Sequence, residues 1–298
     1  ASFGRGGKSS TITDVNLLLG LLDPSTYFGG GLKLDIDRGR AAIDESIASP
    51  LGISVDEALH KLVASYEQKI ADGLKGFGDV TQDTVLLAFG GAGPMNACGV
   101  AELAGINTVY VPKMAAVFSA FGIGSCDIGQ SYAVVLSDRN LDSLKSAYSD
   151  LIARAERDMF AEGYAKGDFE ISAELVSESD SKETIYPLNG NLALLKGLEK
   201  ADSITLEVRA SKRLKTDDDK QVKTSKGKAA TASGMRAIVG RDLKSHDLSV
   251  YSVNEMKAGA HAAGPAVIEE EFFTCLVREG WKFVVTDSGD ICLTKGVK

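Results

Sequence analysis

The chain has 298 residues, 44% of them hydrophobic, so it can bury a sizeable core and is long enough for two domains. Its 33 Lys and Arg against 41 Asp and Glu give a net charge of −8, which argues against general affinity for nucleic acid or anionic membranes. No apolar run approaches the length of a membrane span, and residues 1–10 lack the apolar core of a signal peptide. We therefore expect a cytoplasmic globular protein that has neither a membrane nor a nucleic acid as its partner.

The cysteines and histidines do not predict a metal site. No CxxC pair occurs, and no histidine has a cysteine or a second histidine at ligand spacing. We expect buried free thiols rather than disulfides or zinc ligands, and ordinary surface or boundary histidines. No Ser–His–Asp or Cys–His arrangement can be read from the linear spacing, so the catalytic residues stay unknown. The residues concerned are Cys98, Cys126, Cys275, Cys292, His60, His246 and His261.

Apolar residues at helical spacing dominate the first quarter of the chain. Thr13 is placed to cap the first of these helices, and Ser54 with Glu57 forms a capping box at the start of the longest one. Glycine-rich breaks at residues 4–7 and 27–31 separate the first helix from its neighbours. The spacing predicts helices at residues 14–22, 37–47 and 55–70.

The stretch Thr84–Asn96, TVLLAFGGAGPMN, is the most informative feature of the sequence. The apolar run Val85–Phe89 predicts a strand that is covered on both faces. Glycines follow it at once, and glycine can adopt positive φ and leave the backbone open to a ligand. Pro94 then suits the first turn of a helix, which we expect over residues 94–104.

This strand, turn and helix predict a phosphate or nucleotide corner, because the free N–H groups and the positive dipole end of the helix face the turn. A tight connection without any ligand remains the alternative, since α/β folds also use glycine there for close packing. A strand at residues 108–111 and a helix at 114–124 come next. That order predicts a parallel sheet with crossover helices and a ligand at the carboxyl end of the first strand.

The second half of the chain reads differently. We expect a strand at residues 131–136, an amphipathic helix at 144–163 and then a β-rich domain, which divides the chain into 1–136 and 137–298. Residues 211–234 carry seven Lys or Arg and almost no large apolar side chain, so we expect a mobile loop there. Phosphate binding by its lysines is the alternative. The short strands are expected at residues 204–210, 248–251, 266–268, 272–277, 282–285 and 291–293.

Four blocks of the sequence resemble, in the same order, the C-terminal half of the hydantoinase A/5-oxoprolinase family, which includes the ATP-binding subunits of acetone and acetophenone carboxylases. Together the blocks cover about 40% of the chain. They are FGRGGKSSTITDVNLLLGLLDPSTYFGGGLKLD (Phe3–Asp35), LLAFGGAGPMNACGVAELAGINTVYVP (Leu86–Pro112), AAVFSAFGIGSCDI (Ala115–Ile128) and LSVYSVNEMKAGAHAAGPAVIEEEFFTCLVREGWKFVVTDSGDICL (Leu248–Leu293).

The resemblance implies an α/β region followed by an α+β region. The first would be part of a sugar-kinase/actin-like, ribonuclease H-like ATPase lobe, and the second a β-rich C-terminal domain. In that fold the glycine turn contacts the adenosine and ribose of ATP. Carried onto this sequence, Gly90, Gly91, Ala92 and Gly93 would approach the nucleotide, and Asn96 would donate a hydrogen bond to it.

The family's acidic phosphate loop and its second glycine-rich aspartate motif have no counterpart in this chain. These motifs supply the Mg²⁺ ligands and the main grip on the triphosphate. The resemblance therefore implies that ATP and Mg²⁺ are used together with an N-terminal ATPase half and other subunits of a hetero-oligomeric enzyme, and that the chain is inactive alone. A start without Met inside a familiar block suggests a fragment, a processed chain or numbering after a break.

The implied function is the nucleotide-binding part of an ATP-dependent carboxylase of a ketone such as acetone or acetophenone, which activates the ketone, bicarbonate or both by phosphorylation. Residues 170–188, EISAELVSESDSKETIYPL, lack the RYxGQ-like stretch of hydantoinases and oxoprolinases and so favour the carboxylase branch. ATP-dependent ring opening of a hydantoin, oxoproline or lactam is the alternative enzyme, and a non-catalytic assembly module is the alternative of another class.

Three polar residues near the N-terminus are further candidates for contact with a nucleotide or substrate. Asp14 and Asn16 lie beside the glycine-rich segment, although a residue such as Asp14 at a helix start more often caps the helix. Arg5 is the nearby cation suited to a phosphate.

Overall fold

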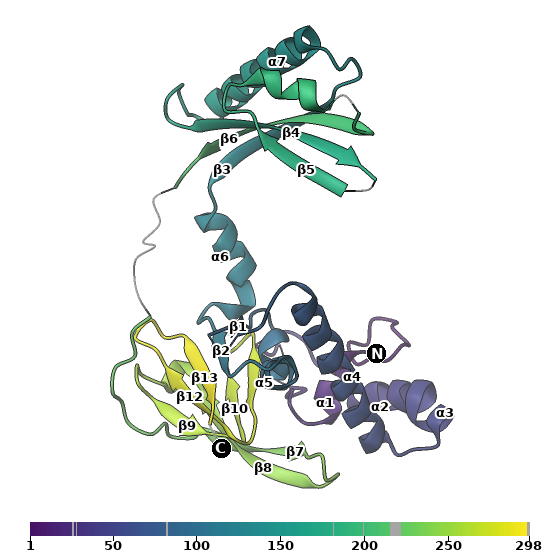
Figure 1. Cartoon of the computed structure of the whole chain (residues 1–298). Helices are drawn as coiled ribbons and strands as arrows, with labels where there is room; N and C mark the ends of the chain where they lie inside the picture. Colours follow the sequence, from purple (N-terminus) through teal and green to yellow (C-terminus); the bar gives the residue numbers. More distant parts are fainter. Residues whose placement is uncertain are drawn as a thin grey trace. The chain divides into compact units, whose positions relative to one another are not determined.

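The structure is a computed structural model that describes residues 1–25, 27, 29–81, 83–180, 182–198, 200–214 and 222–296 (Figure 1). Two compact units divide it: unit 1 comprises Ala1–Phe121 and Lys220–Lys298, and unit 2 comprises Gly122–Asp219. This division differs from the boundary expected at residue 136. The reason is a long-range pairing: β13 (Ile291–Lys295) is antiparallel to β2 (Thr108–Val111), so the end of the chain returns to the sheet of its first third.

The helices of unit 1 begin where capping side chains place them. Thr11, rather than Thr13, caps α1, because the Asp14 carboxylate accepts hydrogen bonds from Thr11 N and Oγ1, both at 2.8 Å. The capping box of α4 is confirmed: Ser54 N donates to Glu57 Oε2 at 2.8 Å, and Glu57 N donates to Ser54 Oγ at 3.2 Å. The helices are α1 (Ile12–Leu18), α2 (Ile36–Ile43), a π-helical turn (Asp44–Ala48), α3 (Ser49–Leu51), α4 (Val55–Gly76) and α5 (Gly93–Ala104).

A five-stranded sheet in the order β1-β2-β13-β12-β9 forms one layer of unit 1. β1 and β2 are parallel and joined through α5, as expected, whereas the other neighbours are antiparallel. The expectation of a parallel sheet therefore holds only for the first pair, because C-terminal strands complete the layer. Besides β2 and β13, its strands are β1 (Val85–Leu87), β9 (His261–Ala263) and β12 (Trp281–Val285).

A second sheet of unit 1 has the order β11-β10-β8-β7, with β8 and β10 parallel. Helix α5 packs against both α4 and β11, and thus lies between the helical layer and the strands (Figure 1). Trp281 is 1% exposed and is one of the largest fully buried side chains of this core. The strands are β7 (Gly234–Val239), β8 (Ser245–Ser252), β10 (Ala266–Glu269) and β11 (Thr274–Val277).

Unit 2 is an antiparallel sheet in the order β3-β6-β4-β5 with α7 packed against β6 and β3 (Figure 1). The apolar face of α7 buries Leu144 and Met159 against sheet residues such as Leu206. The elements are β3 (Ile128–Val135), α7 (Leu141–Ala161), β4 (Glu170–Ser179), β5 (Lys182–Pro187), a 3-10 turn (Leu192–Gly197) and β6 (Ser203–Lys212). A 3-10 turn (Ala115–Val117) and α6 (Phe118–Ser125) precede them.

The expected mobile loop at residues 211–234 is described only in part, since residues 215–221 lie outside the described residues. Residues 222–233 are held to unit 1 by main-chain hydrogen bonds. Ser225 N donates to Asp287 Oδ1 at 2.8 Å, and Ala230 N donates to the carbonyl of His261 at 2.8 Å. Main-chain N–H groups of this stretch thus bind unit 1, and the mobility expected of the loop stays a prediction.

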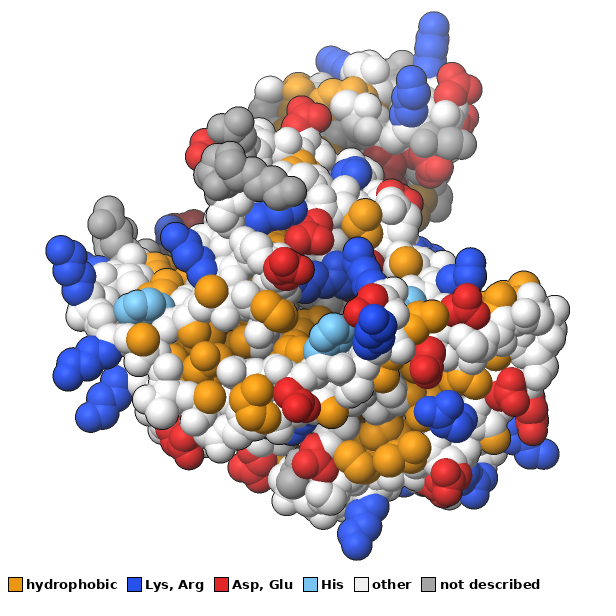
Figure 2. Space-filling view, turned by 90° about the horizontal axis from the view of Figure 1, so that it is seen from below, with side chains coloured by type: hydrophobic (Ala, Val, Ile, Leu, Met, Phe, Trp, Pro, Cys, Tyr) orange, Lys and Arg blue, Asp and Glu red, His pale blue; other side chains and the backbone are white. Residues whose placement is uncertain are grey.

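No helix in the described residues combines the length and apolarity needed to cross a membrane. On the face drawn in Figure 2, basic and acidic side chains are interspersed rather than gathered into one basic patch. This mixed surface agrees with the net charge of −8.

Candidate functional site: the cavity beside the glycine turn

The predicted strand, glycine turn and helix are present. After β1, Ala88 N donates to the carbonyl of Tyr110 at 2.8 Å, and Gly90 N donates to the carbonyl of Ala115 at 2.7 Å. Gly90 has φ +79°, a backbone conformation that residues other than glycine rarely adopt. This conformation explains why the position is a glycine. α5 then begins at Gly93 with Pro94 in its first turn.

One expectation about β1 is wrong. Its run of apolar residues was expected to be covered on both faces, but Val85 is 52% exposed, Leu87 43% and Phe89 44%. Only its other face, with Leu86 and Ala88, packs against the core.

A cavity of about 690 Å³ opens beside the turn, within the size range of small-molecule sites. Apolar and aromatic groups share its wall with carboxylates and hydroxyls. The lining residues are Leu22, Asp23, Tyr27, Gly29, Gly91, Ala92, Ser233, Val250, Ser252, Asn254, Glu269, Glu270, Glu271, Phe272, Phe273 and Thr274.

Only some of the residues that were predicted to contact a nucleotide line this cavity. Gly91 and Ala92 line it, whereas Gly90, Gly93 and Asn96 are not among the residues that do. Asn96 is 5% exposed within α5. The turn therefore presents the backbone of two residues to the cavity, and contact between Asn96 and a ligand stays a prediction.

The acidic segment Glu269–Glu271 forms part of the cavity wall, and sequence reasoning did not single it out. Both guanidinium Nη atoms of Arg236 bind the Glu269 carboxylate, with Nη2 2.9 Å from Oε2. Glu270 Oε2 accepts a hydrogen bond from Phe272 N at 2.9 Å. The available signal was three consecutive glutamates followed by two phenylalanines between strands.

These carboxylates bear on which chemical groups the cavity suits. Carboxylate oxygens accept hydrogen bonds from hydroxyl and amino groups, whereas they repel phosphates. Tyr27 and Phe273 offer aromatic surface at the same wall. The cavity therefore suits an uncharged ring with hydroxyl groups better than a phosphate chain.

The N-terminal candidates lie elsewhere: none of Arg5, Asp14 and Asn16 lines the cavity. Asp14 is fully buried; burial raises its pKa, but hydrogen bonds from Ser2 and Thr11 outweigh this and lower the pKa to about 2. Asp14 thus acts as a helix cap, the alternative that the sequence left open. The side-chain amide of Asn16 is buried and has no hydrogen-bond partner among the described residues.

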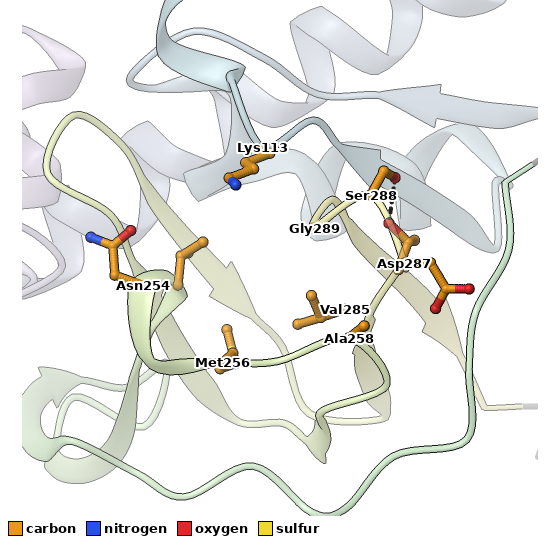
Figure 3. A pocket seen from close by; sticks show the side chains of 10 residues that line it. Lys113, Asn254, Met256, Ala258, Val285, Asp287, Ser288 and Gly289 are labelled. Carbon is orange, nitrogen blue, oxygen red and sulfur yellow. Dashed lines mark hydrogen bonds between the residues drawn. The ribbon is translucent and has the colours of Figure 1, made fainter.

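A second cavity of about 240 Å³ shares Asn254 with the first. Lys113, which follows β2, lies above it, and Ser288 and Gly289 from the turn between β12 and β13 form another side (Figure 3). The carboxylate of Asp287 points away, since its Oδ1 accepts the hydrogen bond from Ser225 N. Lys113 follows β2 as the glycine turn follows β1, so both cavities lie at the carboxyl edge of this parallel pair.

The thiols and imidazoles take no part in either cavity. Cys98 and Cys275 are buried as expected, and burial raises the pKa of Cys98 to about 11; Cys126 is exposed, contrary to expectation. His246 Nε2 lies 2.8 Å from Asp242 Oδ1 at the surface. Within the described ranges, no three His, Cys, Asp or Glu side chains are grouped so that they could hold a metal ion.

Comparison with known proteins finds similar sequences and similar structures. Residues 1–132 match the sequence profile of the hydantoinase/oxoprolinase family. The chain is 28% identical to caprolactamase subunit alpha of Pseudomonas jessenii, over 99% of the chain and 47% of that protein. It is 37% identical to the acetone carboxylase beta subunit of Xanthobacter autotrophicus, over 46% of the chain and 19% of that protein.

Two solved structures share the fold. An ATP-dependent caprolactamase from Pseudomonas jessenii has a TM-score of 0.69 and 26% identity, and a nucleotide-free acetone carboxylase has a TM-score of 0.71 and 22% identity. Each match covers 99% of this chain and 48% of the other. The chain thus spans about half the length of these structures and at most about half of the curated relatives named above. The similarity to the hydantoinase/oxoprolinase family that the sequence predicts is confirmed, with the family profile matched over residues 1–132.

Proposed function

We propose that this chain is the nucleotide-binding part of an ATP-dependent enzyme, with the nucleoside of ATP in the cavity beside Gly91 and Ala92. The observation that carries the proposal is the position of this cavity at the carboxyl end of β1, directly after a glycine turn. Unit 1 is then part of an actin-like ATPase lobe, as the family resemblance implies.

The lining supports a role for each part of the nucleoside. Ribose hydroxyls donate to the carboxylates of the Glu269–Glu271 wall, and the base packs against aromatic side chains such as Tyr27. Gly91 has no side chain, so its main chain can approach the ligand closely. The phosphates leave this acidic wall for the part of the enzyme that corresponds to the other half of the relatives.

Magnesium does not fit the described residues of this chain, because no three Asp, Glu, His or Cys side chains among them are grouped so that they could hold a metal ion. We propose that its ligands and the main triphosphate contacts belong to an N-terminal ATPase half. Other subunits of a hetero-oligomer complete the enzyme, as subunit names such as caprolactamase subunit alpha and acetone carboxylase beta subunit suggest. The chain alone is then inactive.

The first candidate reaction is carboxylation of a ketone such as acetone or acetophenone, with ATP used to activate the ketone, bicarbonate or both by phosphorylation. It is supported by 37% identity to the acetone carboxylase beta subunit and 32% identity to the acetophenone carboxylase gamma subunit of Aromatoleum aromaticum. Those matches cover 46% and 58% of the chain.

The second candidate reaction is ATP-dependent ring opening of a cyclic amide. It is supported by the sequence match to caprolactamase subunit alpha, which extends over 99% of the chain, and by the match to 5-oxoprolinase 1 of Arabidopsis thaliana, which covers 96%. The acetone carboxylase structure also matches 99% of the chain, so coverage does not separate the two reactions. A non-catalytic assembly module is the remaining alternative, and nucleotide binding decides against it.

The nucleotide assignment is tested in the assembled enzyme with Ala92→Phe. Ala92 has ordinary backbone angles (φ −104°, ψ −22°), so a larger side chain fills the cavity without backbone strain. We expect ATP affinity to fall at least about tenfold, a cost of about 1.4 kcal/mol. Ala133→Phe, on the exposed part of β3 in unit 2, is the matched control and leaves the affinity unchanged. Unchanged ATP binding by Ala92→Phe contradicts the assignment.

The two reactions are distinguished by which substrate stimulates ATP hydrolysis in that enzyme. Acetone or acetophenone with bicarbonate stimulates it if the first candidate holds, and caprolactam or 5-oxoproline without bicarbonate if the second holds. Stimulation by neither group, with ATP still bound, refutes both substrate classes and leaves the nucleotide site standing.

A further inference from the structure

Arg236 joins two parts of the cavity wall. It lies on β7, and its guanidinium reaches across β8 to Glu269 at the end of β10. Nη2 lies 2.9 Å from Glu269 Oε2, and Nη1 binds Oε1 of the same carboxylate. Nη1 also donates to the carbonyl of Leu21 at 3.2 Å, immediately before Leu22, which lines the cavity. One side chain thus ties the segment after α1 to the acidic segment Glu269–Glu271.

The Glu269 carboxylate can still accept hydrogen bonds after it has bound Arg236. An ionised carboxylate has about four lone-pair sites, and a bidentate guanidinium occupies one at each oxygen. The side chain of Glu269 is 28% exposed and lines the cavity, whereas that of Arg236 is 16% exposed and does not line it. Glu269 therefore offers the cavity a charged acceptor whose orientation is fixed from outside the lining.

The two neighbouring glutamates are held differently. Glu270 Oε2 accepts from Phe272 N at 2.9 Å, so this oxygen faces the main chain of its own segment. Glu271 packs against Gly29, which has φ +61° and where an added Cβ would meet the Glu271 carboxylate. Among the described residues, Glu269 is the one of the three whose two oxygens are both bound by another side chain.

A fixed acceptor favours binding of a hydroxyl group. A glutamate that rotates freely loses conformational entropy when it binds a ligand, and Glu269 has already lost it by binding Arg236. Hydrogen bonds to a charged acceptor are also stronger than those between neutral groups. A ligand with a hydroxyl at this point gains that bond, whereas an otherwise identical ligand without the hydroxyl does not. The pair therefore distinguishes a ribose from a deoxyribose.

We propose that Glu269 accepts a ribose hydroxyl of the nucleotide and that Arg236 is the positioning residue that orients it, so that the cavity selects a ribonucleotide over a deoxyribonucleotide. The inference rests on the proposed function, because it names the residues that recognise the sugar in the same cavity. A guanidinium that only stabilised the fold would affect both kinds of nucleotide alike. The ratio of their affinities separates the two roles.

Calorimetric titration of the assembled enzyme with ATP and with its 2′-deoxy and 3′-deoxy analogues tests the proposal. We expect the analogue that lacks the hydroxyl bound by Glu269 to bind at least about tenfold more weakly than ATP. Glu269→Ala and Arg236→Met each reduce this ratio to about twofold or less. Arg236→Lys keeps a charge beside Glu269 but not the bidentate contact, so its ratio lies between those of the parent and Arg236→Met.

A double variant shows whether Arg236 acts through Glu269. Glu269→Ala with Arg236→Met leaves no charge of the pair without its partner, and we expect it to bind ATP as tightly as Glu269→Ala alone. Arg139→Met is the matched control, since the guanidinium of Arg139 donates to main-chain carbonyls of unit 2, among them that of Asp202 at 2.8 Å. This control keeps the ratio of the parent.

The possible outcomes separate this inference from the proposed function. ATP binding with a parent ratio below about tenfold, or with a ratio that Arg236→Met leaves unchanged, overturns the inference and leaves the nucleotide site standing. A double variant that binds ATP more weakly than Glu269→Ala overturns the positioning role of Arg236. No binding of ATP by the parent enzyme overturns the proposed function and the inference with it.

Discussion

The carboxylate of Glu67 on α4 and the guanidinium of Arg278, just after β11, meet in the core of unit 1, with Arg278 Nη2 2.5 Å from Glu67 Oε1. Glu67 is 1% exposed. Burial raises its pKa, and the positive charge of Arg278 opposes that rise. Arg278 also approaches Glu102 at 3.6 Å, and Glu102 accepts a hydrogen bond from Trp281 Nε1 at 2.8 Å. The network thus fixes α5, the helix that starts at the glycine turn, between α4 and the strands.

Removing Arg278 should cost much more stability than removing both partners. Arg278→Met leaves the Glu67 carboxylate buried without its cation, so we expect the free energy of unfolding to fall by about 3–5 kcal/mol. In the double variant Glu67→Gln with Arg278→Met no buried charge is left alone, and we expect it to recover at least about 1 kcal/mol. Urea denaturation measures both values. A double variant less stable than Arg278→Met would contradict this account of the pair.

Gly99 on α5 should tolerate no side chain, because a Cβ there would meet the carboxylate of Glu67 and displace it from Arg278. We expect Gly99→Ala to lower the free energy of unfolding by about 2–3 kcal/mol. Gly73→Ala is the matched control: Gly73 lies on α4 with open space around its Cβ position. Helix propensity predicts that this control stabilises the protein by about 0.5–1 kcal/mol. Equal effects of the two substitutions would refute the steric explanation.

Asp14 should make the stability depend on pH in the acid range. Its pKa is lowered from 3.8 to about 2, so the carboxylate contributes stability that is fully present above its ordinary pKa and lost as the pH falls through the lower value. We expect Asp14→Asn to be less stable than the parent chain by about 2 kcal/mol near pH 5, with the difference shrinking toward pH 2. Denaturation at a series of pH values measures this difference. A difference that stays constant between those limits would show that Asp14 is not the group responsible.

Elements fixed by neighbouring residues were predictable from the sequence. The capping box of Ser54 and Glu57 marked the start of α4, and the apolar stripe after it gave the helix. β2 lies at residues 108–111 as expected. By contrast, β4 and β5 were missed, since their burial patterns are mostly exposed or half-buried and give no strong apolar signal. The assignment of C-terminal strands to unit 1 depends on pairing with β2, which no local pattern reveals.

The residues of the candidate site likewise fall into those that a local sequence pattern marks and those that only the fold brings together. Gly91 and Ala92 line the cavity and belong to the glycine turn after a strand, which is a local signal in the sequence. Glu270 and Tyr27 were not predicted, because folding alone brings residues from distant parts of the chain to one cavity. The exposure of Leu87 also escaped prediction, since an apolar run does not distinguish a strand covered on both faces from one that is covered on one face.

The central claim, that the cavity beside the glycine turn holds the nucleoside of ATP, is tested most directly by photolabelling the native assembly with an ATP analogue that carries an azide on its adenine ring. The account predicts labelled peptides from the cavity wall, such as those containing Tyr27, Ala92 or Phe273, and loss of the label when excess ATP competes or when Ala92 is replaced by Phe. The claim would be contradicted if ATP competes with the labelling and the labelled peptides all lie outside this wall.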